Sequence, residues 1–204
     1  MYIMRRIAHV EGLQGIEKAV EATQVVQNAG VPASLWVGGP GSIPGTVAWS
    51  VGVETFAQWA GYTDTLAADA AYGDFARKHV GAIVVTEADS LGEVVYGEIQ
   101  GQSEVGDYVG SLEAVVHSDR AADAAAFAVE VADAFAATTG LSAAVVKHLA
   151  GDQATIGWLV RYGTAEAVDD AEAMTAASAD YAAVMAKNTG LFTAGNRMFA
   201  RRAA

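Results

Sequence analysis

Two histidines stand 108 residues apart and are the first candidates for chemistry. His9 and His117 each lie at the end of a segment that we expect to form a strand. An imidazole can transfer a proton as a general acid or base, or serve as an axial ligand of haem. The alternative is an ordinary, half-exposed polar side chain at a strand end. We take His9 and His117 as candidate catalytic residues, one in each half of the chain.

Two tryptophans and two tyrosines recur in the same way. Trp49 and Trp158 stand 109 residues apart, and so do Tyr72 and Tyr181. Aromatic rings offer flat apolar walls to an aromatic substrate, and phenol hydroxyls can orient it. The alternative is that these side chains fill the core between sheet and helices. As site residues, the four are candidates for substrate binding.

Metal chemistry and phosphate binding have little support. The chain has no cysteine, and its four histidines nowhere pair with carboxylates at ligand spacing, so we predict no metal site. His79 and His148 have no counterpart in the other half. The glycine-rich segment 38–45 has no lysine and is predicted to join two strands rather than to open a helix, which indicates a long hairpin loop. We therefore expect no cofactor, with haem on His9 or His117 as the alternative.

An internal repeat must position these residues. A shift of 109 residues places Thr46-Val-Ala-Trp49-Ser-Val51 on Thr155-Ile-Gly-Trp158-Leu-Val160. The match extends upstream when the offset is changed by one residue, and Gly30 then lies on Gly140. These two glycines are predicted to end the first helix of each half. The chain is therefore expected to contain two copies of one structural unit.

Periodicity and turn residues predict the same order of elements in each half: strand, helix, strand, strand, helix, strand. In the first half we expect strands at 2–9, 33–37, 46–53, 82–86 and 93–99, and helices at 13–29 and 55–78, the second broken near residue 73. In the second half we expect strands at 111–117, 143–149, 155–162 and 191–201, and helices at 120–139 and 164–187. This order is that of a ferredoxin-like unit, whose sheet carries helices on one face only. The open face must be covered, and the other copy is the natural cover.

With these repeats, the sequence resembles the dimeric α/β-barrel superfamily, specifically members in which two ferredoxin-like units share one chain. The repeated Thr-x-x-Trp-x-Val strand carries the resemblance, together with the alanine-rich helix that ends in Tyr-x-x-x-x-x-Lys. The fold class it implies is α+β, with two tandem βαββαβ repeats whose antiparallel sheets pack into a pseudo-twofold barrel. We expect repeats at 1–99 and 109–204, with 100–108 as linker. The superfamily includes cofactor-free monooxygenases, haem-binding proteins, isomerases and proteins of no known activity, so the resemblance bounds the function without choosing it.

Charge and composition exclude other classes. Twelve Lys and Arg against 24 Asp and Glu give a net charge of −12, which disfavours nucleic acid as a partner. No apolar stretch is long enough to span a membrane, and the lack of cysteine and of a recognisable leader predicts a cytoplasmic protein. The charged fraction of 18% is low, which favours a large buried surface and a homo-oligomer.

These observations lead to one function and two alternatives. The leading hypothesis is a barrel protein that binds a small apolar or aromatic molecule in one or both cavities between sheet and helices. If it is an enzyme, it would be a cofactor-independent monooxygenase or an isomerase. The alternatives are a structural or assembly protein that acts through subunit interfaces, and a haem-handling protein.

Overall fold

The computed structural model describes residues 1–79, 81, 83–85, 89–99, 101–151 and 153–204. The first half contains β1 (Tyr2–His9), α1 (Gly12–Asn28), β2 (Ser34–Gly38), β3 (Thr46–Val53), α2 (Phe56–Ala68), α3 (Ala70–Lys78), β4 (Val84–Val85) and β5 (Ser90–Tyr96). The second contains β6 (Tyr108–Val116), α4 (Ala121–Thr139), β7 (Ala143–Ala150), β8 (Thr155–Tyr162), α5 (Ala165–Ala177), α6 (Ala179–Met185) and β9 (Phe192–Arg202). The strand expected at 82–86 lies partly outside the described residues, which within it show only β4.

Eight of the strands close into an antiparallel barrel. The hydrogen-bonded order within the first half is β5-β1-β3-β2, and within the second it is β9-β6-β8-β7. The halves join edge to edge, because β2 pairs with β9 and β5 pairs with β7. The expected α+β class is confirmed: two ferredoxin-like sheets form a pseudo-twofold barrel. The exact division of the chain at residues 99 and 109 stays a prediction.

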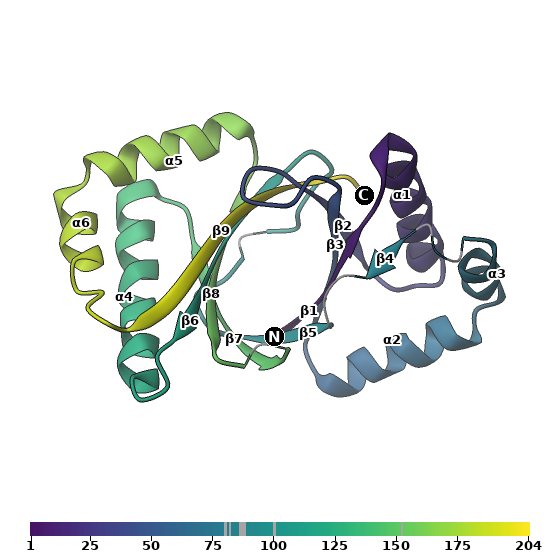
Figure 1. Cartoon of the computed structure of the whole chain (residues 1–204), viewed down its shortest axis with the longest axis horizontal. Helices are drawn as coiled ribbons and strands as arrows, with labels where there is room; N and C mark the ends of the chain where they lie inside the picture. Colours follow the sequence, from purple (N-terminus) through teal and green to yellow (C-terminus); the bar gives the residue numbers. More distant parts are fainter. Residues whose placement is uncertain (80, 82, 86–88, 100, 152) are drawn as a thin grey trace.

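The helices cover the barrel from two opposite sides (Figure 1). In that view α1, α2 and α3 lie at the right against the first sheet, and α4, α5 and α6 lie at the left against the second. Each sheet therefore has one face towards helices and one face towards the barrel interior. Among the described residues, no helix is long and apolar enough to cross a membrane.

Alternation along the strands separates a helix-facing core from the barrel interior. In β8 the even-numbered residues Ile156, Trp158, Val160 and Tyr162 pack in the hydrophobic core of the second half. The intervening Gly157, Leu159 and Arg161 face the interior of the barrel. The period of two residues in a strand produces this division, so each strand supplies both a core face and an interior face.

Both second helices break where a short polar residue caps a new helix. The Asp69 carboxylate accepts a hydrogen bond from the backbone N–H of Tyr72 at 2.7 Å, and the Ser178 hydroxyl accepts one from Tyr181 N–H at 3.1 Å. We expected one helix at 55–78, broken near residue 73, and one at 164–187. Each of these is instead two helices, α2 and α3 in the first half and α5 and α6 in the second. A side-chain acceptor at the N-cap satisfies a free N–H of the next helix, which stabilises the break.

Candidate functional site

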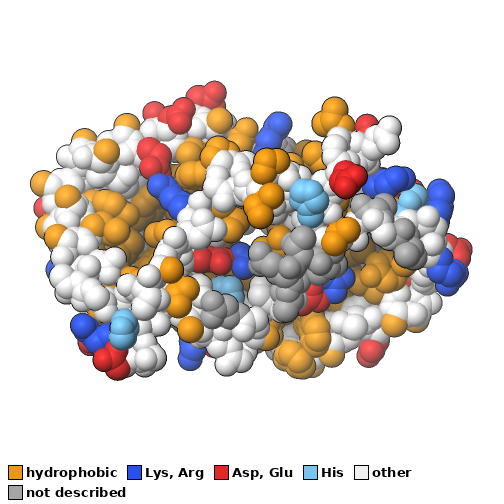
Figure 2. All heavy atoms as spheres, viewed as in Figure 1, with side chains coloured by type: hydrophobic (Ala, Val, Ile, Leu, Met, Phe, Trp, Pro, Cys, Tyr) orange, Lys and Arg blue, Asp and Glu red, His pale blue; other side chains and the backbone are white. Residues whose placement is uncertain are grey.

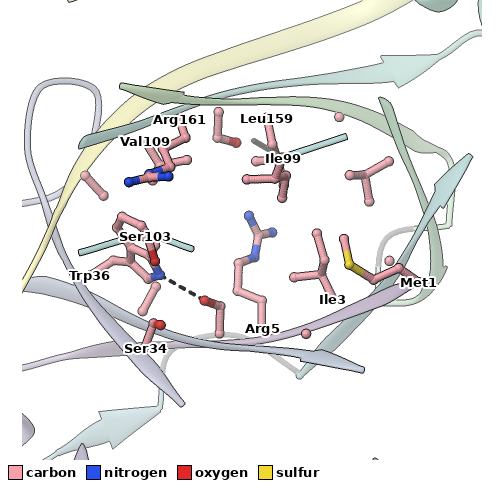
Figure 3. A pocket seen from close by; sticks show the side chains of 18 of the residues that line it. Met1, Ile3, Arg5, Ser34, Trp36, Ile99, Ser103, Val109, Leu159 and Arg161 are labelled. Carbon is pink, nitrogen blue, oxygen red and sulfur yellow. Dashed lines mark hydrogen bonds between the residues drawn. The ribbon is translucent and has the colours of Figure 1, made fainter. Parts of the chain in front are cut away.

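The barrel interior is a cavity of about 680 Å³, which we call the lumen. A volume of this size is typical of sites that bind small organic molecules. Apolar side chains from strands of both halves form much of its wall. They include Ile3, Trp36, Val109, Val146, Leu159 and Met198. Figure 3 shows several of these side chains pointing into the same open space.

An ion pair crosses this apolar space. Arg5 of β1 donates from Nη1 to Oε1 of Glu113 on β6, and each side chain is only 21% exposed. Figure 3 shows Arg5 rising from its strand into the middle of the lumen. In the space-filling view, acidic and basic side chains lie side by side in a hollow between the two halves (Figure 2). A charge pair in so apolar a chamber gives the lumen one strongly polar point.

A buried histidine lies beside the acidic partner of that pair. His148 of β7 lines the lumen and is 8% exposed. A Cβ built on Gly157 would lie 3.7 Å from Glu113 Cγ and 3.9 Å from His148 Nε2. Glu113 and His148 therefore flank the same glycine, and the absent side chain leaves space between them. This places two potential proton acceptors and one guanidinium donor around one small volume.

Two further arginines at the lumen wall are engaged by the segment that joins the halves. Arg161 Nη2 lies 2.7 Å from Oδ2 of Asp107, a residue that is 7% exposed. Arg202 donates to the backbone oxygen and to the hydroxyl of Ser103. Both contacts hold the segment between the halves against strands of the second sheet. Their guanidinium groups therefore have structural partners already.

Hydroxyl groups add to the polar part of the lumen. Ser50 accepts a hydrogen bond from Trp36 Nε1 at 2.9 Å, which is the dashed line in Figure 3. Ser111 Oγ, two residues before Glu113 on the same face of β6, is buried and has no hydrogen-bond partner among the described residues. A buried hydroxyl without a partner is unusual in a folded protein.

Trp49 and Trp158 lie on the opposite face of the sheet, towards the helices. Trp49 Nε1 donates to Thr23 Oγ1 at 2.8 Å, and Trp158 Nε1 donates to the backbone oxygen of Ala128 at 2.9 Å. Neither ring is among the residues that line the lumen in the described part of the chain. Each indole binds its own helix, α1 or α4, to the sheet. Their predicted role in substrate binding stays a prediction.

Tyr72 and Tyr181 also lie on the helix side. Tyr181 packs against the core of the second half, and burial raises the pKa of its hydroxyl, with nearby Arg197 acting in the opposite direction. The hydrogen bond with Asp89 is the main cause that raises the pKa of Arg6, and nearby Tyr72 adds to this shift. The structure does not bring the two tyrosines together, because Tyr72 is on α3 and Tyr181 is on α6, which lie on opposite sides of the barrel (Figure 1). Their predicted role in substrate binding also stays a prediction.

His9 and His117 occur at corresponding strand ends but have different surroundings. His9 is half-buried beside the 38–45 loop, where a Cβ on Gly45 would approach its ring at 2.7 Å. His117 is 51% exposed, and its Nδ1 lies 2.7 Å from Asp119 Oδ1. This contact helps to lower the pKa of the Asp119 carboxyl. Neither imidazole lines the lumen among the described residues, and their catalytic role stays a prediction.

Metal ligands do not converge in the parts of the chain that the structure describes. No group of three or more His, Asp or Glu side chains is arranged there to hold a metal ion.

Known structures share this architecture along the whole chain. A candidate monooxygenase from Fusobacterium nucleatum matches with a TM-score of 0.73 and 8% identity, covering 100% of this chain and 93% of that one. An anthrone oxidase-like protein matches with a TM-score of 0.67 and 12% identity, covering 100% and 91%. A major regulator of staphylococcal pathogenesis matches with a TM-score of 0.60 and 11% identity, covering 100% of both chains. No protein-family model matches the sequence, and no curated protein matches it.

These likenesses show the fold of the chain. The chain has the fold of the dimeric α/β-barrel superfamily, with both ferredoxin-like units in one polypeptide. At identities of 8–12% the likeness shows the fold alone. The three proteins are named as a candidate monooxygenase, an anthrone oxidase-like protein and a regulator, so function must be argued from the site.

Proposed function

We propose that the protein binds a small, largely apolar organic molecule in the lumen and moves a proton to or from it at the Arg5–Glu113 pair. The observation that carries this proposal is the lumen itself: about 680 Å³, walled by apolar side chains and crossed by one ion pair. Apolar walls supply binding energy, and a few polar groups fix the orientation of the ligand. This binding site lies inside the barrel, whereas the sequence favours a cavity between the sheet and the helices.

The arrangement of charges suits proton transfer. Glu113 and His148 can each accept a proton from an O–H group or an activated C–H group of a ligand beside Gly157. Arg5 can donate hydrogen bonds to the oxygen on which negative charge then develops. Return of the proton to another atom gives isomerisation. Reaction of the ligand anion with O₂ gives oxygenation, and the similarity to a candidate monooxygenase and an anthrone oxidase-like protein supports that direction.

Ligand binding can be tested with a neutral aromatic ketone such as 2-tetralone. Binding at about 100 times Kd is expected to raise the melting temperature by about 5–10 °C. Leu159→Trp places a larger ring in the lumen and should reduce the shift. Met174→Trp is the matched control, because Met174 is 49% exposed on α5. A shift of equal size in the wild type and in Leu159→Trp would place the ligand elsewhere.

Proton transfer has its own readout. The acidic C–H protons of 2-tetralone exchange with D₂O, and NMR measures the rate. We expect the protein to accelerate this exchange, and we expect Glu113→Gln combined with His148→Gln to remove the acceleration while 2-tetralone still binds. Binding without any acceleration would leave a ligand-binding protein and exclude the acid–base role.

Assembly through subunit contacts is the second candidate function, and a surface groove favours it. The groove has a volume of about 470 Å³ and lies between α1, the start of the 38–45 loop and β9. Val105 lines it and is 69% exposed, and Leu13, three residues from the lining residue Ile16, is 80% exposed. A second copy of this chain is the occupant we propose, which makes the protein a homo-oligomer. Separately, from the lack of cysteine, we propose that the protein is cytoplasmic. Light scattering of the wild type and of Leu13→Asp combined with Val105→Asp tests this, and a monomeric wild type would exclude it.

A further inference from the structure

The arginines that line the lumen are already engaged by other groups, which bears on what the lumen can bind. Arg5 is paired with Glu113, and Arg161 with Asp107. Arg202 donates to oxygens of Ser103 and Ala204. These contacts leave no arginine of the lumen wall without a bonding partner among the described residues.

The central pair retains hydrogen-bonding capacity on both sides. A guanidinium has five N–H donors, and the contact with Glu113 uses Nη1 of Arg5. Among the described residues, neither side chain has a further hydrogen bond in the structure. The lumen thus presents free N–H donors of Arg5 next to a free carboxylate oxygen of Glu113.

This juxtaposition discriminates between ligands by charge. A neutral group with a donor beside an acceptor, such as a primary amide, can bond to Glu113 and Arg5 together without separating them. A carboxylate can bond to Arg5 only by bringing its own charge against Glu113 in a partly desolvated chamber. Like charges at contact distance in such surroundings repel strongly. Specificity of this kind comes from a repulsive element as much as from an attractive one.

We propose that the lumen selects neutral ligands that carry a hydrogen-bond donor next to an acceptor, and that Glu113 is the residue that excludes anions. The inference rests on the proposed function, namely that small molecules bind in the lumen. It adds the chemical class of the ligand and assigns Glu113 a role in specificity. The substrate of a reaction at this site would enter uncharged and become an anion only after proton transfer.

Three isosteric probes test the proposal: 2-naphthamide, 2-naphthoate and 2-naphthamidine, which are neutral, anionic and cationic at pH 7. Isothermal titration of the wild type should show 2-naphthamide binding at least about tenfold more tightly than either ion. Glu113→Gln leaves Arg5 with a neutral partner of the same shape, so 2-naphthoate should become the tightest probe. Arg5→Gln leaves Glu113 without its cation, so 2-naphthamidine should become the tightest.

Controls separate this inference from the function on which it rests. The double variant Arg5→Gln/Glu113→Gln should lose the discrimination against both ions, and circular dichroism reports whether each variant is folded. The wild-type comparison needs no variant, so it decides the question even if a variant fails to fold. If 2-naphthoate binds the wild type as tightly as 2-naphthamide, and Leu159→Trp weakens both, the selection for neutral ligands is wrong while lumen binding stands. If 2-tetralone binds but none of these three probes does, the inference is wrong; if 2-tetralone also fails to bind, the proposed function itself fails.

Discussion

Arg5 and Glu113, at matching positions in the first strand of each half, meet across the centre of the barrel. They stand 108 residues apart, as do His9 and His117 at the ends of the same strands. Equivalent residues that meet in this way lie next to the pseudo-twofold axis. In a symmetric pair of identical chains, both positions would carry the same residue, and two like charges would face each other. One chain that holds both units can place opposite charges there.

The first prediction concerns the stability that this pair provides. Glu113→Leu leaves a largely buried guanidinium without its counter-ion, and we expect it to lower the free energy of unfolding by about 2–3 kcal/mol. The double variant Arg5→Met/Glu113→Leu should recover most of that loss, because no charge remains unpaired. Urea unfolding of the four proteins of this cycle gives the coupling energy.

The neighbouring pair Arg6–Asp89 provides the control. It lies outside the lumen, and both of its side chains are 42% exposed. Water and salt screen such a pair, so the same cycle on Arg6 and Asp89 should give a coupling of about 1 kcal/mol or less. Equal couplings for the two pairs would contradict the partly desolvated lumen described above.

The elements of the fold could be predicted from the sequence because their signals are local. Alternation and turn residues predicted β3 at 46–53 and β8 at 155–162, which are the observed bounds. The repeat predicted that both halves share one topology. The break in the first half was expected near residue 73 and lies at Asp69, whereas the break at Ser178 was not predicted. A polar cap inside an alanine-rich helical segment is a weak signal beside strong helix propensity.

The location of the cavity could not be predicted in the same way. A strand offers two faces, and the bulky face with Trp49 or Trp158 looked like the wall of a binding site. The cavity lies on the other face, where small residues such as Ala48 and Gly157 leave space. His148 has no counterpart in the first half, so the repeat does not single it out. The available signal was the alternation of small and large residues along β3, together with Gly157 between two bulky residues of β8.

The second prediction concerns Gly157, where a substitution should change ligand affinity without lowering the free energy of unfolding. A methyl group there would make ordinary contacts of 3.7 and 3.9 Å with Glu113 and His148. Gly157→Ala should therefore leave the free energy of unfolding unchanged or raise it by about 0.5–1 kcal/mol. The methyl group occupies the space between the proposed proton acceptors, so the affinity for 2-naphthamide should fall.

Gly92 of β5, which pairs with His148 of β7, is the comparison for Gly157→Ala. A Cβ on Gly92 would lie 2.4 Å from Val146 Cγ1, so Gly92→Ala should be destabilising. Unfolding curves and titration calorimetry on both variants give the two quantities. Unchanged affinity in Gly157→Ala would mean that the ligand does not reach the space between Glu113 and His148.

The third prediction tests the helix-facing tryptophans. Thr23 is fully buried in α1 and accepts the hydrogen bond of Trp49 Nε1. Thr23→Val keeps the shape but leaves this donor without an acceptor, which should cost about 1–3 kcal/mol of stability. We expect the affinity of the lumen for 2-naphthamide to stay the same. A loss of affinity in Thr23→Val or Trp49→Phe would instead support the role of Trp49 in substrate binding.

The fourth prediction concerns alkaline pH. Tyr162 is 1% exposed, and burial is the main cause that raises the pKa of its hydroxyl above the usual value of 10.0. Because the folded state holds this proton more tightly than the unfolded state, the contribution of Tyr162 to stability is fully present below pH 10. It is lost as the pH rises from about 10 through the higher pKa of the folded protein, by up to about 1.4 kcal/mol per pH unit.

Tyr162→Phe cannot ionise, so its unfolding midpoint in urea should fall less than that of the wild type between pH 9 and pH 11. Tyr181→Phe should show the same trend because burial raises that pKa also, and parallel curves for all three proteins would show that neither phenol carries the alkaline loss.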